Sequence, residues 1–237
     1  MNSGLKGLLQ LVLAFTTVQE FENYLLLVAA LQQCPELVPS NVQTLTIKLE
    51  FQDSLIDEYY SAHLAAEALA SPSLRQMNIE VEQLSQLQIF SPSMARLNHI
   101  SPRVVHLGLR SRGQNAAHDS NKDYWPLENF KLGFEKLTRL KLHKIPIRPI
   151  EFKGLVGFQH SYSPNLVELE LIDNFSTELL DLREHLVQSS LLTSFKMNQW
   201  MCCDQTFSGY FGKLRELKLS LKNFTFMKQL QYPSGLR

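Results

Sequence analysis

Residues able to do acid–base, nucleophilic or metal chemistry are scattered along this sequence of 237 residues. Its seven histidines and three cysteines form neither a His-Glu-x-x-His nor a Cys-x-x-Cys spacing, the arrangements that bring zinc ligands together. Cys202 and Cys203 are adjacent, and buried thiols of this kind are more often structural than redox-active. Gly154-x-x-Gly157 is too sparse for a phosphate-binding loop. The sequence therefore predicts no catalytic residue, no cofactor and no metal, in a protein that is not an enzyme.

Charged side chains instead alternate with apolar ones in several short runs, as in Arg139-Leu140-Lys141 and Glu168-Leu169-Glu170. Because successive side chains of a strand point to opposite faces, we expect these charges on the face opposite the leucines. Such a face could recognise a protein partner. The predicted partner-binding residues form a basic patch, an adjacent acidic ridge and two further positions: His106, Arg110, Arg112, Arg139, Lys141 and His143; Glu168 and Glu170; and Lys196 and Trp200.

A simpler interpretation of the same charges is structural. If the strands lie in register, Arg139 stands beside Glu168, and Lys141 stands beside Glu170. Exposed cross-strand pairs of this kind contribute about 0.2–1 kcal/mol each. The two interpretations are compatible, because a partner would also meet a solvated charged surface.

The strands themselves are predicted by a repeated pattern, seen most clearly in Ser163-Pro164-Asn165 followed by Leu166-x-x-Leu169-x-Leu171. Equivalent patterns begin at residues 42, 74, 104, 137, 166, 192 and 214, which predicts seven strands. Their spacing of 32, 30, 33, 29, 26 and 22 residues lies in or just above the range of about 20–29 typical of leucine-rich repeats. Apolar helical patterns between them, over residues 53–69, 82–90, 92–98 and 177–188, predict intervening helices.

Strand alternating with helix at this period predicts an α/β fold, a leucine-rich-repeat solenoid (horseshoe) with an inner parallel sheet and outer helices. Residues 1–36 are expected to form an N-terminal helical cap, with a helix over 18–33, and residues 37–237 to form the repeats. Residues 110–123 contain little to bury and predict a projecting loop. An eighth repeat starts near Leu236, so we expect a chain truncated at its C-terminus, a fragment of a longer protein.

Composition narrows the partners and the compartment. The charges cancel and the pI is about 7.1, which gives no global attraction to nucleic acid or to an anionic membrane. The odd number of cysteines favours a reducing compartment, cytoplasmic or nuclear. Leu8–Phe15 faintly resembles the apolar part of a signal peptide, but Gln10 interrupts it.

Cys34-Pro35-Glu36-Leu37 and the run from Ser163 to Leu171 resemble the irregular leucine-rich repeats of F-box proteins, which often open Cys-Pro-x-Leu or Ser-Pro-x-Leu. The resemblance extends from about residue 34 onward. It implies a protein-interaction module that captures substrates for a cullin-RING ubiquitin ligase. No Leu-Pro-x-Glu-type F-box opening precedes the repeats, so contact with ligase components would need an F-box outside this chain. The alternatives are a free-standing leucine-rich-repeat scaffold or sensor and, least favoured, a small α/β enzyme.

Overall fold

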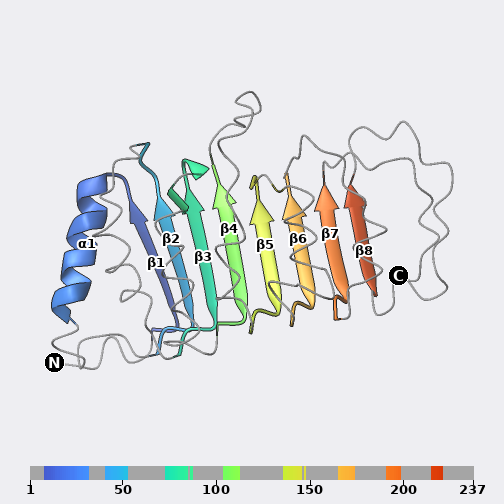
Figure 1. The fold of residues 1–237 in the computed structure, drawn as a ribbon. Coiled ribbons are helices and arrows are strands. Elements are labelled where there is room, and N and C mark those ends of the chain that lie inside the picture. Colours follow the sequence, from blue (N-terminus) through green and yellow to red (C-terminus); the bar gives the residue numbers. More distant parts are fainter. Residues whose placement is uncertain are drawn as a thin grey trace.

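The computed structural model describes residues 8–31, 41–52, 73–84, 86–87, 104–112, 136–145, 147, 165–173, 191–198 and 215–220. These residues contain eight strands and one helix (Figure 1). The elements are β1 (Gln10–Phe15), α1 (Val18–Leu31), β2 (Thr44–Leu49), β3 (Gln76–Val81), β4 (His106–Ser111), β5 (Arg139–His143), β6 (Glu168–Ile172), β7 (Ser194–Asn198) and β8 (Glu216–Ser220).

All eight strands are parallel and lie in one sheet in the order of the sequence. Figure 1 shows them as a single row from β1, next to α1, to β8. The seven predicted strands are all present, and each begins two residues later than its apolar pattern. The structure therefore confirms the parallel sheet of the expected α/β fold.

A repeated pair of hydrogen bonds joins neighbouring strands at the point where each strand begins. The residue before each strand from β1 to β7 offers one carbonyl oxygen to two consecutive amide groups at the start of the next strand. For example, the Val105 carbonyl accepts from the amides of Thr138 and Arg139, at 2.9 and 3.0 Å. The preceding apolar residue, Leu137 in this repeat, is buried although it lies outside the strand. Before β2, β3, β5, β6 and β7, the first apolar position of the pattern therefore belongs to the core but not to the strand.

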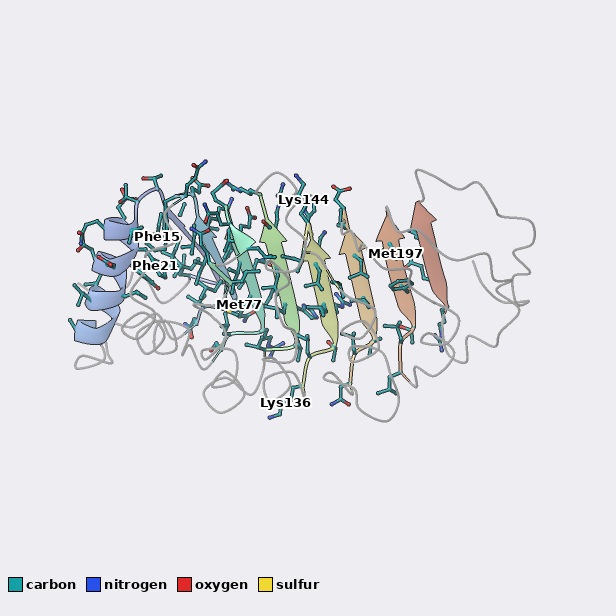
Figure 2. The ribbon with its side chains drawn as sticks, turned by 45° about the horizontal axis from the view of Figure 1, so that its top comes forward. Phe15, Phe21, Met77, Lys136, Lys144 and Met197 are labelled. Carbon is teal, nitrogen blue, oxygen red and sulfur yellow. The ribbon has the colours of Figure 1, made fainter. Side chains whose placement is uncertain are left out.

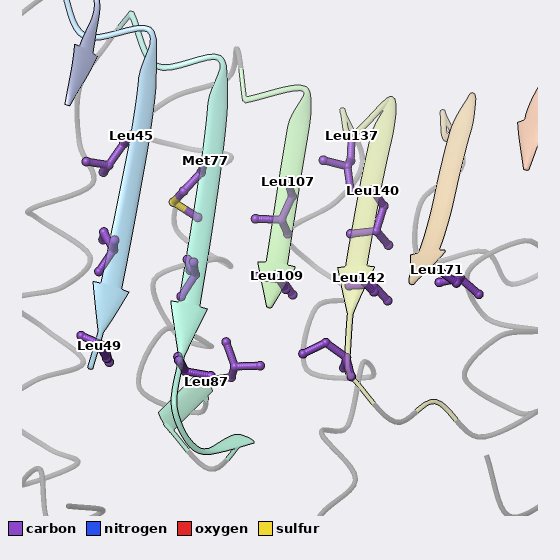
Figure 3. Packing of buried hydrophobic residues seen from close by; sticks show 14 of the residues in the cluster. Leu45, Leu49, Met77, Leu87, Leu107, Leu109, Leu137, Leu140, Leu142 and Leu171 are labelled. Atoms are coloured by element: carbon purple, nitrogen blue, oxygen red, sulfur yellow. The ribbon is translucent and has the colours of Figure 1, made fainter. Parts of the chain in front are cut away.

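The core lies on one face of the sheet. The two inward positions predicted for each strand are buried in β2 to β7, and in β5 they are Leu140 and Leu142. Figure 3 shows side chains from β2 to β6 lined up on that side. Because the strands are in register, equal positions stack as rows, and each row buries its apolar surface against the next.

The N-terminal segment departs from the expectation of a purely helical cap. The apolar run at its start forms β1, which pairs with β2 from Gln10↔Thr44 to Phe15↔Leu49. The alternation over these residues is short and mixed with consecutive leucines, so periodicity alone did not distinguish a strand. The helix expected from residue 18 begins there as α1.

A capping box starts α1. The Thr17 hydroxyl accepts a hydrogen bond from the Glu20 amide at 3.2 Å. In return, the Glu20 carboxylate accepts hydrogen bonds from the amides of Thr16 and Thr17 at 2.8 and 3.3 Å. These hydrogen bonds hold the pKa of Glu20 below its usual value. Phe21 and Leu25 are buried, and the Phe15 and Phe21 rings meet edge to face with centroids 5.2 Å apart (Figure 2).

Several expectations fall outside the described residues. These are the helices at 53–69, 92–98 and 177–188, nearly all of the loop at 110–123, and the eighth repeat near Leu236. The helix expected at 82–90 coincides in part with a 3₁₀ turn at residues 84, 86 and 87. Gln86, which is buried, ties this turn to the segment after β2 by donating to the Phe51 carbonyl at 2.8 Å. No helix in the described part is long and apolar enough to cross a membrane.

Candidate functional site: the polar face of the sheet

The face opposite the core is polar over β2 to β8, and we call it the polar face. Parallel register arranges its residues in three rows that cross the sheet. The first row is Thr44, Gln76, His106, Arg139, Glu168, Ser194 and Glu216; the second is Thr46, Asn78, Gly108, Lys141, Glu170, Lys196 and Lys218; the third is Lys48, Glu80, Arg110, His143 and the apolar Ile172. The predicted order of side-by-side residues is therefore correct.

The predicted basic patch and acidic ridge meet as ion pairs between β5 and β6. Arg139 Nε lies 3.0 Å from Glu168 Oε2, and Lys141 Nζ lies 3.4 Å from Glu170 Oε2. Roughly half of each cationic side chain remains exposed, 55% for Arg139 and 53% for Lys141. The structural interpretation is thus confirmed, while the cations stay accessible to a partner.

A second group of charges joins β7 to β8 through Glu216. Its carboxylate lies 2.8 Å from Lys218 Nζ and 3.5 Å from Lys196 Nζ, and it accepts the Ser194 hydroxyl at 2.7 Å. The hydrogen bonds from Lys218 and Ser194 lower the pKa of Glu216 to about 2. Lys196, a predicted partner-binding residue, therefore stands in a charged group centred on Glu216.

The two histidines of the basic patch both have a lowered pKa. Partial burial, and then the positive charge of Arg139, lowers the pKa of His106 below its usual value. Burial is also the main cause that lowers the pKa of His143, opposed by a hydrogen bond to Asp173. His143 Nε2 lies 3.3 Å from Asp173 Oδ2. Both shifts favour the neutral imidazole over the charged one.

Arg112 points away from the basic patch. Its guanidinium lies 2.9 Å from both Glu50 and Glu80, and 3.7 Å from Glu82. We call these four residues the Arg112 cluster; it joins β3 to the residues that directly follow β2, β3 and β4. Lys48 adds a longer contact to Glu80 at 3.9 Å. Arg112 therefore links strands β2 to β4 instead of extending the basic patch toward β5.

The remaining predicted residues differ in what surrounds them. Arg110 is exposed, stands between Glu80 and His143 in the third row, and makes no ion pair with the described residues. Trp200 lies outside the described part of the chain. The sequence analysis missed the roles of Glu50, Glu82 and Asp173. Each directly follows a strand, so extending the predicted register by one residue would have drawn attention to them.

In the second row, the side chain of Asn78 lies so close to position 108 on β4 that only a small residue fits there. Asn78 donates to the Thr46 hydroxyl at 3.2 Å, and its Oδ1 would lie 2.6 Å from a Cβ on Gly108. Glycine at position 108 thus leaves space for the Asn78 amide.

Comparison with known proteins finds no matching family model, no matching curated protein and no matching solved structure. Within the described residues, no group of three or more histidine, cysteine, aspartate or glutamate side chains is arranged to hold a metal ion. The physical argument for function therefore depends on the sheet and its polar face.

Proposed function

We propose that this chain is a leucine-rich-repeat solenoid that recognises a protein partner through its polar face. Its seven predicted repeats each contribute one strand, with the strands parallel, in sequence order and in common register. Quasi-one-dimensional stacking of this kind produces the extended surfaces that repeat proteins use for binding. The outer helices and the horseshoe curvature belong to this proposal.

One observation carries the functional part. The register places Arg139 and Lys141 on one strand, directly beside Glu168 and Glu170 on the next, with all four side chains at least 36% exposed. Adjacent stripes of opposite charge select a partner with the reverse arrangement, because like charges brought together are costly. The overall charge of zero favours this local, protein-directed recognition over nucleic acid or membrane.

Within this class, we propose the substrate-recognition arm of an F-box-type ubiquitin ligase subunit in the cytoplasm or nucleus. The support is the resemblance of the Cys-Pro-x-Leu and Ser-Pro-x-Leu openings to F-box repeats. Copurification of the cullin adaptor with the full-length protein would support the ligase role. If the full-length protein shows no adaptor binding, the alternative of a free-standing scaffold or sensor replaces it.

The strand order favours binding over catalysis. Open α/β enzymes bind ligands where the strand order reverses, because the helices on either side then diverge and leave a crevice. The described strands run from β1 to β8 without a reversal. A small α/β enzyme is therefore the least favoured proposal.

A charge-swap experiment separates recognition from stability. Arg139→Glu with Lys141→Glu places four carboxylates together, so we expect lost partner binding and a modest loss of stability. Adding Glu168→Arg and Glu170→Lys restores two opposite-charge pairs while exchanging the two stripes. We expect this fourfold variant to recover its unfolding midpoint and still fail to bind.

The matched control is Arg75→Glu with Arg215→Glu, which changes the net charge equally at two exposed residues that precede strands. Proteins captured by affinity purification are compared quantitatively among wild type, both reversals and the swap, alongside thermal unfolding of each. Binding that returns with the swap would mean that the charges act only within the fold. Equal loss in the Arg75 and Arg215 control would mean that net charge, not the polar face, governs capture.

A further inference from the structure

Gly108 is the only glycine among the residues of the three rows, so it leaves one position of the polar face without a side chain. The Asn78 amide lies along the sheet surface beside it, because Nδ2 donates to Thr46 on β2 and Oδ1 would lie 2.6 Å from a Cβ on Gly108. Gly108 itself stays partly exposed. The polar face is thus lower at Gly108 than at the neighbouring positions that carry arginine or lysine.

Cations surround Gly108 along β4 and on the side of β5. Eight positions of the rows are adjacent to it, along the strand, across the sheet or diagonally. They hold three permanent cations, two histidines, two amides and one acid: Arg110, Arg139 and Lys141; His106 and His143; Gln76 and Asn78; and Glu80. The acid, Glu80, is already held 2.9 Å from Arg112. Because neighbouring strands lie about 4.7–4.9 Å apart, the side chains of Arg110 and Lys141 are long enough to reach the space above Gly108.

Two of these cations are available to a ligand. Arg110 is exposed and makes no ion pair with the described residues. Its positive charge contributes to the lowered pKa of His143, which indicates that the guanidinium lies toward β5. Lys141 is 53% exposed, and its contact with Glu170 is long, at 3.4 Å. Exposed ion pairs are weak, so Lys141 exchanges Glu170 for another carboxylate at little cost.

We propose that the polar face receives an acidic side chain of the protein partner at Gly108, between Arg110 and Lys141. This inference rests on the proposed function and adds the chemistry of the partner. We call Gly108, Asn78, Arg110 and Lys141 the Gly108 subsite. Charge-assisted hydrogen bonds from the two cations bind the carboxylate. The Thr46 hydroxyl both donates and accepts, so the Asn78 amide keeps this contact when it turns over and directs Nδ2 to the carboxylate.

The charges around the Gly108 subsite select this ligand. A basic side chain placed there would meet three cations, and an apolar one would remove water from them without replacing their hydrogen bonds. An extended polyanion such as nucleic acid is disfavoured too, because Glu168 and Glu170 lie on β6, two strands away from Gly108. An isolated acidic residue in an otherwise neutral or basic protein segment therefore matches the polar face best.

A phage-displayed library of random dodecapeptides, selected on the immobilised full chain, is the probe. The selected peptides are sequenced before any variant is used, so that the variants cannot bias their charge. Peptides that bind the polar face are then recognised by weaker binding when the cations of β5 or the acids of β6 are neutralised, by Arg139→Gln with Lys141→Gln or by Glu168→Gln with Glu170→Gln. We expect the peptides that bind the polar face to share an aspartate or a glutamate.

Arg110→Gln measures the contact with that acid. Fluorescence anisotropy gives the Kd of one synthetic peptide and of the same peptide with its acid replaced by the matching amide. Arg110→Gln should weaken binding of the acidic peptide about tenfold, and binding of the amide peptide by no more than about twofold. The control Arg215→Gln removes the same charge from an exposed residue before β8, and it should change the Kd of either peptide by no more than about twofold.

A neutral block tests the position itself. Asn78→Ala removes the amide that a new side chain at position 108 would meet, and Gly108→Gln in that background fills the subsite without changing any charge. Binding of the acidic peptide should fall at least about tenfold relative to Asn78→Ala alone, because the glutamine occupies the space of the carboxylate. Thermal unfolding confirms that each variant is folded before its binding is compared.

The outcomes separate the Gly108 subsite from the proposed function. If no selected peptide binds the polar face, the proposed recognition surface fails and the subsite fails with it. If peptides bind the polar face without an acidic residue, if Arg110→Gln weakens both peptide forms equally, or if the block has no effect, only the subsite is refuted. An acidic peptide that is weakened by Arg110→Gln and by the block, and is unaffected by Arg215→Gln, supports it.

Discussion

Replacing Arg112 with methionine removes the cation that holds three carboxylates at the ends of β2 and β3. The Arg112 side chain is 31% exposed and makes two contacts of 2.9 Å, to Glu50 and Glu80. Exposed ion pairs contribute about 0.2–1 kcal/mol each, and hydrogen bonds to charged groups about 1.5–3 kcal/mol. Since these two contacts are only partly buried, we expect each to contribute about 1 kcal/mol, the upper end of the range for ion pairs, and so a loss of about 2 kcal/mol in total.

Arg110→Met supplies the matched control. Arg110 lies two residues before Arg112, on β4; its replacement removes the same charge, and it makes no ion pair with the described residues. Its replacement should change stability by no more than about 0.5 kcal/mol. Thermal unfolding of both variants and wild type, supported by urea titration, measures the difference. For a chain of this size, about 2 kcal/mol corresponds to a decrease in Tm of about 4–8 °C.

Salt provides an internal check on the cause. Screening at about 1 M ionic strength reduces the Debye length to about 3 Å, so the gap between the two variants should shrink by at least about half. Equal stability of Arg112→Met and Arg110→Met at low salt would refute the reasoning, because it would show that the Arg112 cluster does not hold the strand ends together. A gap unaffected by salt would point to lost packing of the arginine stem instead of charge.

Three further predictions concern single positions. Phe195→Ala should lower the free energy of unfolding by about 3–5 kcal/mol in chemical denaturation, because the ring is fully buried; a loss below about 1 kcal/mol would contradict its place in the core. Gly108→Ala should couple to Asn78→Ala by about 1 kcal/mol in a double-mutant cycle, since the added Cβ displaces the Asn78 amide, whereas additive effects would argue against the contact. Arg110→Gln should raise the pKa of His143 in an NMR titration, because the positive charge of Arg110 adds to burial in lowering that pKa. The stability linked to the lowered pKa is present above about pH 6.5 and declines as the pH falls. An unchanged or lower pKa of His143 in the variant would refute this assignment.

The amino-acid sequence was sufficient to predict the seven repeated strands and their relative register. Leucines at fixed spacing, such as Leu137, Leu140 and Leu142, define both the burial and the repeat, and alternation then assigns the intervening residues to the opposite face. The pairs Arg139–Glu168 and Lys141–Glu170 follow from that register, because equal positions of parallel neighbours lie side by side.

The repeat pattern could not predict the contacts made by residues at turns and strand ends. Arg112 was assigned to the basic patch because it is close in sequence to Arg110, but its long side chain reaches Glu50, far away in sequence and two strands across the sheet. Strand β1 was missed because a short apolar run fits a strand, a buried helix or a leader equally well until a neighbouring strand supplies its hydrogen bonds.

Local spacing thus determined which side chains are buried and which rows the polar residues form. Only the tertiary structure decided which charges neutralise one another and where the first strand lies. The physical reason is that burial follows from alternation within one strand, whereas ion pairs and strand pairing depend on distances between segments that the sequence places far apart.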